Sequence, residues 1–106
     1  MIKNLSPAEA KKILGEQAGV RLIDVREKWE YDTAKIDNSE LMPLSEFNDH
    51  FQKLNPDDNL IIVCHHGNRS FTVSSFLVQN GFKNVSNLDG GIDAWSQEVD
   101  PTIPTY

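Results

Sequence analysis

The chain has 106 residues, which is enough for one core of sheet and helices and too few for two. Its 10 basic and 16 acidic residues give a net charge of −6 at pH 7, which argues against nucleic acid or an anionic membrane as the main partner. No apolar run approaches the roughly 18 residues of a membrane span. The start, Met1 to Asn4, leads into a capped helix without the apolar core of a signal peptide. We therefore expect one cytoplasmic domain over residues 1–106.

The pattern before the middle of the chain predicts a helix and two strands. Ser6 to Glu9 has the sequence of a capping box with proline at the first helical position, so a helix should follow and end near residues 15–19. Leu22 to Val25 predicts a short buried strand, and Leu41-Met42 predicts another. The polar stretch between them, with Trp29, is expected to form one helical turn at most.

A second helix is predicted from apolar spacing. Leu44, Phe47, Phe51 and Leu54 recur at helical intervals until Asn55-Pro56 ends the run.

The rest of the chain alternates strands with helices. The run at residues 59–63, rich in branched apolar residues, predicts a buried strand, and residues 85–88 predict a last strand. Residues 70–80 predict a helix, and Ile92, Trp95 and Val99 predict a final short one. This alternation indicates a mostly parallel sheet with helices on both faces, in which ligands bind beyond the carboxyl ends of the strands. Three loops leave those ends, at residues 26–30, at Cys64 and at residues 89–91.

The loop after the central strand carries the chemistry. Cys64 is the only cysteine, so an internal disulfide and a Cys-x-x-Cys redox pair are excluded, and any second thiol must come from a substrate or partner. Its place between a strand and a helix start favours the reactive thiolate, because backbone N–H groups converge there. Gly67 and Asn68 permit a tight backbone, and Arg69 adds a cation. A small buried hydrophobe is the alternative interpretation of Cys64.

These segments together resemble the rhodanese domain, a single-domain sulfurtransferase. The resemblance runs from about Ser6 to Tyr106 and depends on four motifs in order: Leu22 to Arg26 with Trp29-Glu30-Tyr31, Leu41 to Leu44, Cys64 to Ser70, and Leu88 to Trp95. The family implies a five-stranded parallel sheet flanked by helices. It also implies a catalytic cysteine that carries a persulfide.

The resemblance assigns roles within the loop. It makes Cys64 the catalytic residue, and it makes His65, His66, Gly67, Asn68 and Arg69 the residues that surround the transferred sulfur and bind substrate. The implied partners are a small anionic sulfur donor such as thiosulfate and an acceptor that is cyanide or a thiol, with a protein as an alternative sulfur acceptor; no cofactor is implied. The chain departs from the family pattern at Lys35 and at Asp37-Asn38-Ser39, where we expect a different surface loop without loss of chemistry.

Other interpretations remain open. Related phosphatases and arsenate reductases have five residues between cysteine and arginine, whereas four separate Cys64 from Arg69, so that activity is disfavoured. A binding or regulatory module without turnover is a further alternative. We expect no metal, because the consecutive Cys64, His65 and His66 rarely converge on one tetrahedral ion. Asp24 and Arg26 could pair to brace the loop or line its rim, with bracing favoured, and Ser70 is also assigned structural support.

Overall fold

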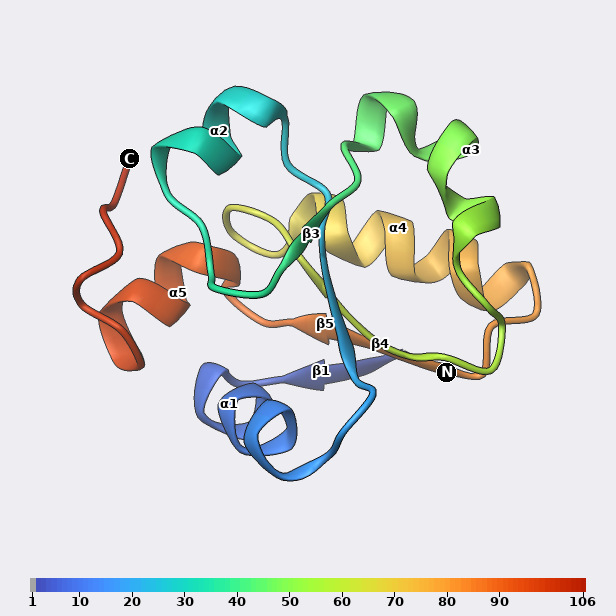
Figure 1. Cartoon of the computed structure of the whole chain (residues 1–106), viewed down its shortest axis with the longest axis horizontal. Coiled ribbons are helices and arrows are strands. Elements are labelled where there is room, and N and C mark those ends of the chain that lie inside the picture. The colour runs from blue at the N-terminus through green and yellow to red at the C-terminus, as the bar shows by residue number, and fades with distance from the viewer. Residues whose placement is uncertain (1) are drawn as a thin grey trace.

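Five parallel strands form one sheet in the computed structural model, which describes residues 2–106. The strands lie in the order β1-β5-β4-β2-β3, and every neighbouring pair is parallel (Figure 1). The predicted five-stranded parallel sheet is thereby confirmed. Its members are β1 (Lys3–Leu5), β2 (Arg21–Asp24), β3 (Glu40–Leu41), β4 (Asn59–Val63) and β5 (Asn84–Leu88).

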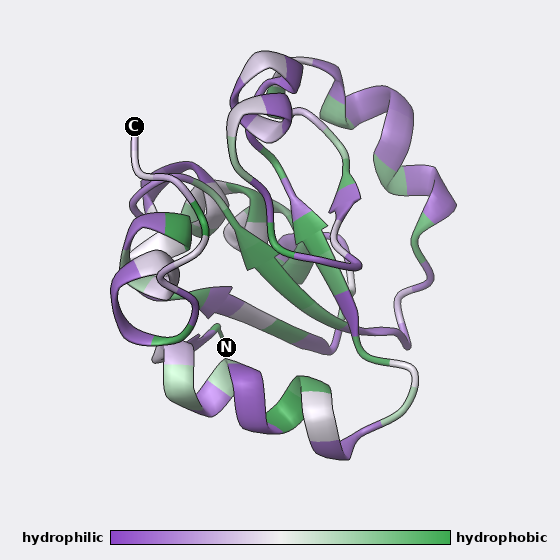
Figure 2. Ribbon diagram, turned by 60° about the vertical axis from the view of Figure 1, so that its left-hand side comes forward, coloured by the Kyte–Doolittle hydropathy of each residue, from purple (hydrophilic) through white to green (hydrophobic). Residues whose placement is uncertain are grey.

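Helices cover both faces of this sheet. On one face lie α1 (Pro7–Glu16) and α5 (Gly91–Glu98), and on the other lie α3 (Phe47–His50) and α4 (Asn68–Gln79). The short α2 (Lys28–Thr33) follows the carboxyl end of β2. In Figure 2 two strands at the middle of the sheet are mostly green, while the helices around them are mostly purple and white.

The central strand β4 is apolar from Leu60 to Val63 because both of its faces are buried there. Ile62 belongs to the core cluster that includes Val73 and Leu77 of α4, whereas its neighbour Ile61 belongs to the cluster that includes Ile92 of α5. Successive side chains of a strand point to opposite faces. A strand covered on both faces therefore has a continuous apolar sequence, as the run at residues 59–63 indicated.

Local signals placed the ends of two helices correctly. The capping box is present, since Glu9 N donates to Ser6 Oγ at 3.2 Å and Ser6 N donates to Glu9 Oε1 at 2.9 Å. At the end of α4, Gly81 has a φ of 88° and Phe82 N donates to Leu77 O at 3.0 Å. The helix itself begins at Asn68, two residues earlier than expected, and α2 is longer than the single turn we expected.

The predicted helix over residues 44–54 is wrong as one continuous element. It is divided into a 3-10 turn at Leu44–Glu46, the α3 turn and a second 3-10 turn at Phe51–Lys53. The apolar spacing contains the reason. The three-residue steps, 44 to 47 and 51 to 54, coincide with the i to i+3 hydrogen bonds of the 3-10 turns, and the four-residue step lies on α3.

The edge strand β1 was missed by the sequence pattern. We had taken this segment only as the lead into α1, and its first residue, Met1, lies outside the described residues. Three residues are too few to show an alternating pattern; pairing with β5 defines the strand, with Leu5 opposite Leu88. Within residues 2–106, no helix is long and apolar enough to cross a bilayer.

Candidate active site

The Cys64 loop is shaped by a glycine that starts the following helix. Cys64 comes directly after β4, and Gly67 caps α4 with a φ of 108°, in the left-handed region that favours glycine. A side chain at Gly67 would also lie 3.3 Å from the backbone nitrogen of Gly90. The loop can therefore close tightly between the end of β4 and the first turn of α4.

The start of α5 holds the loop from the other side. Ile92 N donates to the carbonyl of Cys64 at 2.8 Å, and Asp93 N donates to the carbonyl of His65 at 3.1 Å. These are N–H groups of the first helical turn, which have no partner within their own helix. Gly91 permits the approach, because a Cβ there would overlap both carbonyl oxygens. The loop backbone is thus fixed by two helix starts.

The Cys64 thiol lies at the inside of this loop. Only 1% of the residue is exposed, and its Sγ accepts a hydrogen bond from the backbone N–H of Gly67 at 3.0 Å. The hydroxyl of Ser70, on the first turn of α4, lies 3.3 Å from the same sulfur. Such contacts stabilise a sulfur that carries negative charge.

Ser70 connects the thiol to a polar group that the sequence analysis missed. Its single hydroxyl hydrogen has three acceptors within reach, namely Cys64 Sγ, the Gly67 carbonyl and Asn87 Oδ1. The Asn87 amide nitrogen in turn lies 3.1 Å from Asn4 Oδ1. Asn87 is 3% exposed, and its signal in the sequence was a polar amide one residue before the end of a predicted strand. The structural role assigned to Ser70 stays a prediction, now with named contacts.

The Arg69 side chain forms an ion pair with Glu30 of α2. Its two terminal nitrogens donate to the two carboxylate oxygens of Glu30 at 2.6 and 2.7 Å. The Glu30 side chain is 5% exposed, and the Arg69 hydrogen bonds lower the pKa of Glu30 to about 2 against the opposing effect of burial. Donor binding by Arg69 remains a prediction. Its other N–H groups could contact a donor, but its charge is offset by Glu30.

The expected pair between Asp24 and Arg26 is present and buried. Arg26 Nη2 lies 2.7 Å from Asp24 Oδ2, and neither side chain is more than 1% exposed. Arg26 also donates to the Ala34 carbonyl at 2.6 Å and to the Glu30 carbonyl at 3.3 Å. The pair therefore braces α2, and through α2 it holds the carboxylate that binds Arg69.

Tyr106, which the sequence analysis did not single out, links these two ion pairs. Its hydroxyl accepts from Arg26 Nη1 at 2.9 Å and donates to Glu30 Oε2 at 2.7 Å. Burial raises the pKa of Tyr106 to about 12, so the hydroxyl keeps the proton that it donates. Nothing local in the sequence indicated this contact, because the partners are 80 and 76 residues away.

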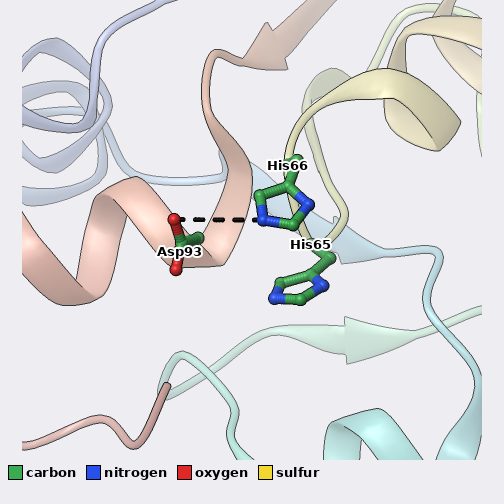
Figure 3. A group of neighbouring side chains, drawn as sticks. All are labelled: His65, His66 and Asp93. Carbon is green, nitrogen blue, oxygen red and sulfur yellow. Dashed lines mark ion pairs between the residues drawn. The ribbon is translucent and has the colours of Figure 1, made fainter. Parts of the chain in front are cut away.

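The two loop histidines point out of the loop toward other elements. Figure 3 shows His66 facing Asp93 of α5, with 4.0 Å between Nε2 and Oδ2. One ligand atom from each of His65, His66 and Asp93 lies within 4.8 Å of the other two. A ring nitrogen binds metal in the plane of its ring, yet the two rings are stacked 3.9 Å apart at 27°. They would have to turn apart before one ion could bind both.

The three loops that were expected to build the site do meet. The loop after β2 leads into α2 and supplies Glu30, the second loop contains Cys64, and the loop after β5 supplies Gly91 to Asp93. The departure noted at residues 35–39 forms a turn in which Asn38 has a φ of 67°. None of the contacts of Cys64 or Arg69 described above involves that turn.

Comparisons with known proteins agree with this fold. Residues 6–98 match the family model described as the rhodanese-like domain. Over 89 residues, 34% are identical to thiosulfate sulfurtransferase GlpE of Pseudomonas fluorescens, covering 84% of this chain and 81% of that protein. A rhodanese-related protein from Thermoplasma volcanium superposes with a TM-score of 0.84 at 30% identity, covering 98% of this chain and 99% of that one.

A plant relative shows the domain inside a longer protein. The chain is 43% identical over 90 residues to the chloroplastic rhodanese-like/PpiC domain-containing protein 12 of Arabidopsis thaliana. The match covers 81% of this chain and only 30% of that protein. The fold and the site define an α/β domain that holds a buried cysteine between the central strand β4 and the start of α4. The chain belongs to the rhodanese-like domain family, and its relatives include sulfurtransferases.

Proposed function

We propose that this protein is a sulfurtransferase that moves sulfane sulfur from a donor such as thiosulfate to cyanide or a thiol, through a persulfide on Cys64. The observation that carries the proposal is the position of the Cys64 sulfur. It lies inside a loop fixed by two helix starts, with the Gly67 N–H 3.0 Å from Sγ. The named sulfurtransferases among its relatives support the same reaction class.

The first half-reaction adds the donor's outer sulfur to Cys64. The Cys64 thiolate attacks the outer sulfur of thiosulfate, a bond forms between the two sulfurs, and the bond to the sulfonate sulfur breaks with its electron pair leaving as sulfite. Thiolate and thiosulfate dianion thus become a persulfide anion and sulfite dianion, with charge conserved. Backbone N–H groups of residues 65–69 are the proposed donors to the new terminal sulfur. The N–H groups of Arg69 that do not bind Glu30 are the proposed contacts for donor oxygens.

The second half-reaction transfers the sulfur from Cys64 to the acceptor. Cyanide attacks the terminal sulfur, thiocyanate leaves, and the electron pair of the broken bond returns to Cys64 as thiolate. A thiol acceptor attacks as its thiolate and becomes a persulfide itself. Because each half-reaction ends in a stable form of the protein, the steady-state kinetics should be ping-pong.

The test is the mass of the intact protein. Incubation with thiosulfate followed by removal of small molecules should add the mass of one sulfur atom, and cyanide should remove it while thiocyanate appears. Cys64→Ser is the control and should gain nothing. An unchanged mass for the unsubstituted protein under these conditions would reject turnover and favour the alternative, a binding module.

A further inference from the structure

Four aromatic rings form a continuous row beside the Cys64 loop. Trp29 of α2 meets Tyr106 edge to face, with ring centroids 5.9 Å apart at 74°. Tyr106 stacks on His65 at 4.0 Å and 7°, and His65 stacks on His66 at 3.9 Å. We call this set, Trp29, Tyr106, His65 and His66, the aromatic row. Two of its members, His65 and His66, directly follow Cys64 in the chain, so the row lies along the outer side of the loop that contains Cys64.

The ends of the row are open to solvent. Trp29 is 64% exposed and the His66 side chain is 62% exposed, while the two rings between them are partly buried. Exposed aromatic side chains lose contact with water when an apolar group covers them, and ring pairs gain further from stacking. The row therefore offers an apolar surface to any group attached to the sulfur donor.

Positive charge beside the loop is weak. The pair of Arg69 with Glu30 has no net charge, and the low pKa of Glu30 keeps that carboxylate ionised at neutral pH. Burial, the first cause, lowers the pKa of His65, which favours the neutral ring there. A dianion such as thiosulfate thus gains little from these side chains beyond directional hydrogen bonds.

We propose that the aromatic row makes this site prefer organic sulfur donors, monoanions in which an aromatic group is attached next to the transferable sulfur, over donors that lack such a group. The proposal rests on the proposed function and specifies its substrate class. The organic group lies on the exposed rings of the aromatic row while the outer sulfur enters the loop.

The reaction keeps the same balance with an organic thiosulfonate. The Cys64 thiolate attacks the outer sulfur, the bond from that sulfur to the sulfonyl sulfur breaks, and its electron pair leaves as a sulfinate. Two monoanions become a persulfide anion and a sulfinate anion. One sulfur–sulfur bond forms as another breaks, so no oxidant or reductant is required, and the leaving sulfinate carries the organic group away from the row.

Two donors that differ only in the substituent test the proposal. Benzenethiosulfonate and methanethiosulfonate carry the same charge and release the same kind of leaving group. For each, kcat/KM is measured from thiocyanate production with cyanide as acceptor, and the ratio of the two values is compared between variants. The ratio corrects for unfolded protein, because both donors are tested on one sample.

Substitutions inside and outside the aromatic row separate the effect of its rings from a general effect of losing an exposed aromatic side chain. Trp29→Ala and Tyr106→Leu should each lower the benzene-to-methane ratio about fivefold, the size expected for one lost ring contact. Tyr106→Phe replaces the ring without the hydroxyl and should restore the preference. The matched control is Phe71→Ala on the first turn of α4, since Phe71 is 44% exposed and outside the row. It should keep the ratio of the unsubstituted protein.

The outcomes are distinct. If Trp29→Ala and Tyr106→Leu keep the original ratio, or if Phe71→Ala lowers it equally, the aromatic row does not select the donor, although sulfur transfer still stands. If no donor adds sulfur to the protein, the proposed function fails and this inference fails with it.

Discussion

Two ion pairs lie at the carboxyl end of the sheet, and they differ in burial and reach. Asp24 and Arg26 are two residues apart, and their side chains are at most 1% exposed. Glu30 and Arg69 are 39 residues apart, and the Arg69 side chain is 35% exposed. The first pair holds α2 within one segment, whereas the second joins α2 to the loop that contains Cys64. We infer that the first supports the fold and that the second sets the charge beside the site.

The comparison of the two pairs assumes that Cys64 is the reacting group. The first prediction, which has the largest expected effect, tests this assumption. Cys64→Ser should reduce thiocyanate production from thiosulfate to less than a few per cent, because a hydroxyl of similar size cannot form the persulfide. The thermal unfolding midpoint of the variant should stay near that of the original chain. Substantial remaining activity in the variant would remove Cys64 from the mechanism.

The second prediction separates the two pairs by stability. Arg26→Met leaves the buried Asp24 carboxylate without its partner and should lower the free energy of unfolding by about 3–5 kcal/mol. Arg69→Met removes a side chain that is 35% exposed and leaves Glu30 with the Tyr106 hydroxyl as a donor, so it should cost less, about 2 kcal/mol. Urea unfolding of both variants measures the difference. Equal losses would mean that the pairs have the same structural role.

The two pairs also mark what the sequence could and could not predict. Asp24 and Arg26 were paired correctly because they are near neighbours in the chain, and the capping box of Ser6 and Glu9 was found for the same reason. The Cys64 loop was located from a strand, a glycine and a helix start that follow one another. Local chemistry was sufficient for each of these.

Contacts between distant segments were not predictable from local patterns. Glu30 was known only as part of a motif, and its hold on Arg69 depends on how α2 is placed over the loop. Tyr106 reaches the site from 80 residues beyond Arg26, and Asn87 reaches the Gly67 carbonyl from β5. The β1 strand is defined by its pairing with β5 alone. Such contacts exist only once the sheet order is known.

The third prediction concerns how the pair of Glu30 and Arg69 makes the stability of the protein depend on pH. The pKa of Glu30 falls to about 2 in the folded protein from an ordinary value of 4.5, so the unfolded chain binds the proton more readily. The stabilisation from this ionised carboxylate is fully present above pH 4.5 and is lost as the pH falls toward about 2. Glu30→Gln should therefore show a weaker loss of stability between these values.

Urea unfolding at a series of pH values measures that slope. Glu98→Gln is the control, because it removes an exposed carboxylate of α5 far along the chain from Arg69. An identical pH dependence in Glu30→Gln and the original chain would mean that Arg69 does not stabilise the ionised form of Glu30.

The smallest expected effect concerns donor binding and tests whether Glu30 offsets the charge of Arg69. Glu30→Gln keeps the shape and a carbonyl that can accept from Tyr106, but it leaves the Arg69 guanidinium uncompensated. The apparent KM for thiosulfate should fall about threefold, the size of one half-exposed charge interaction. Glu27→Gln is the matched control, since Glu27 precedes α2 and hydrogen-bonds Ser45 rather than Arg69. If both variants lower KM equally, the effect is one of overall charge. If Glu30→Gln raises KM, the pair orients Arg69 for the donor, and the two arginines then differ less in role than their burial indicates.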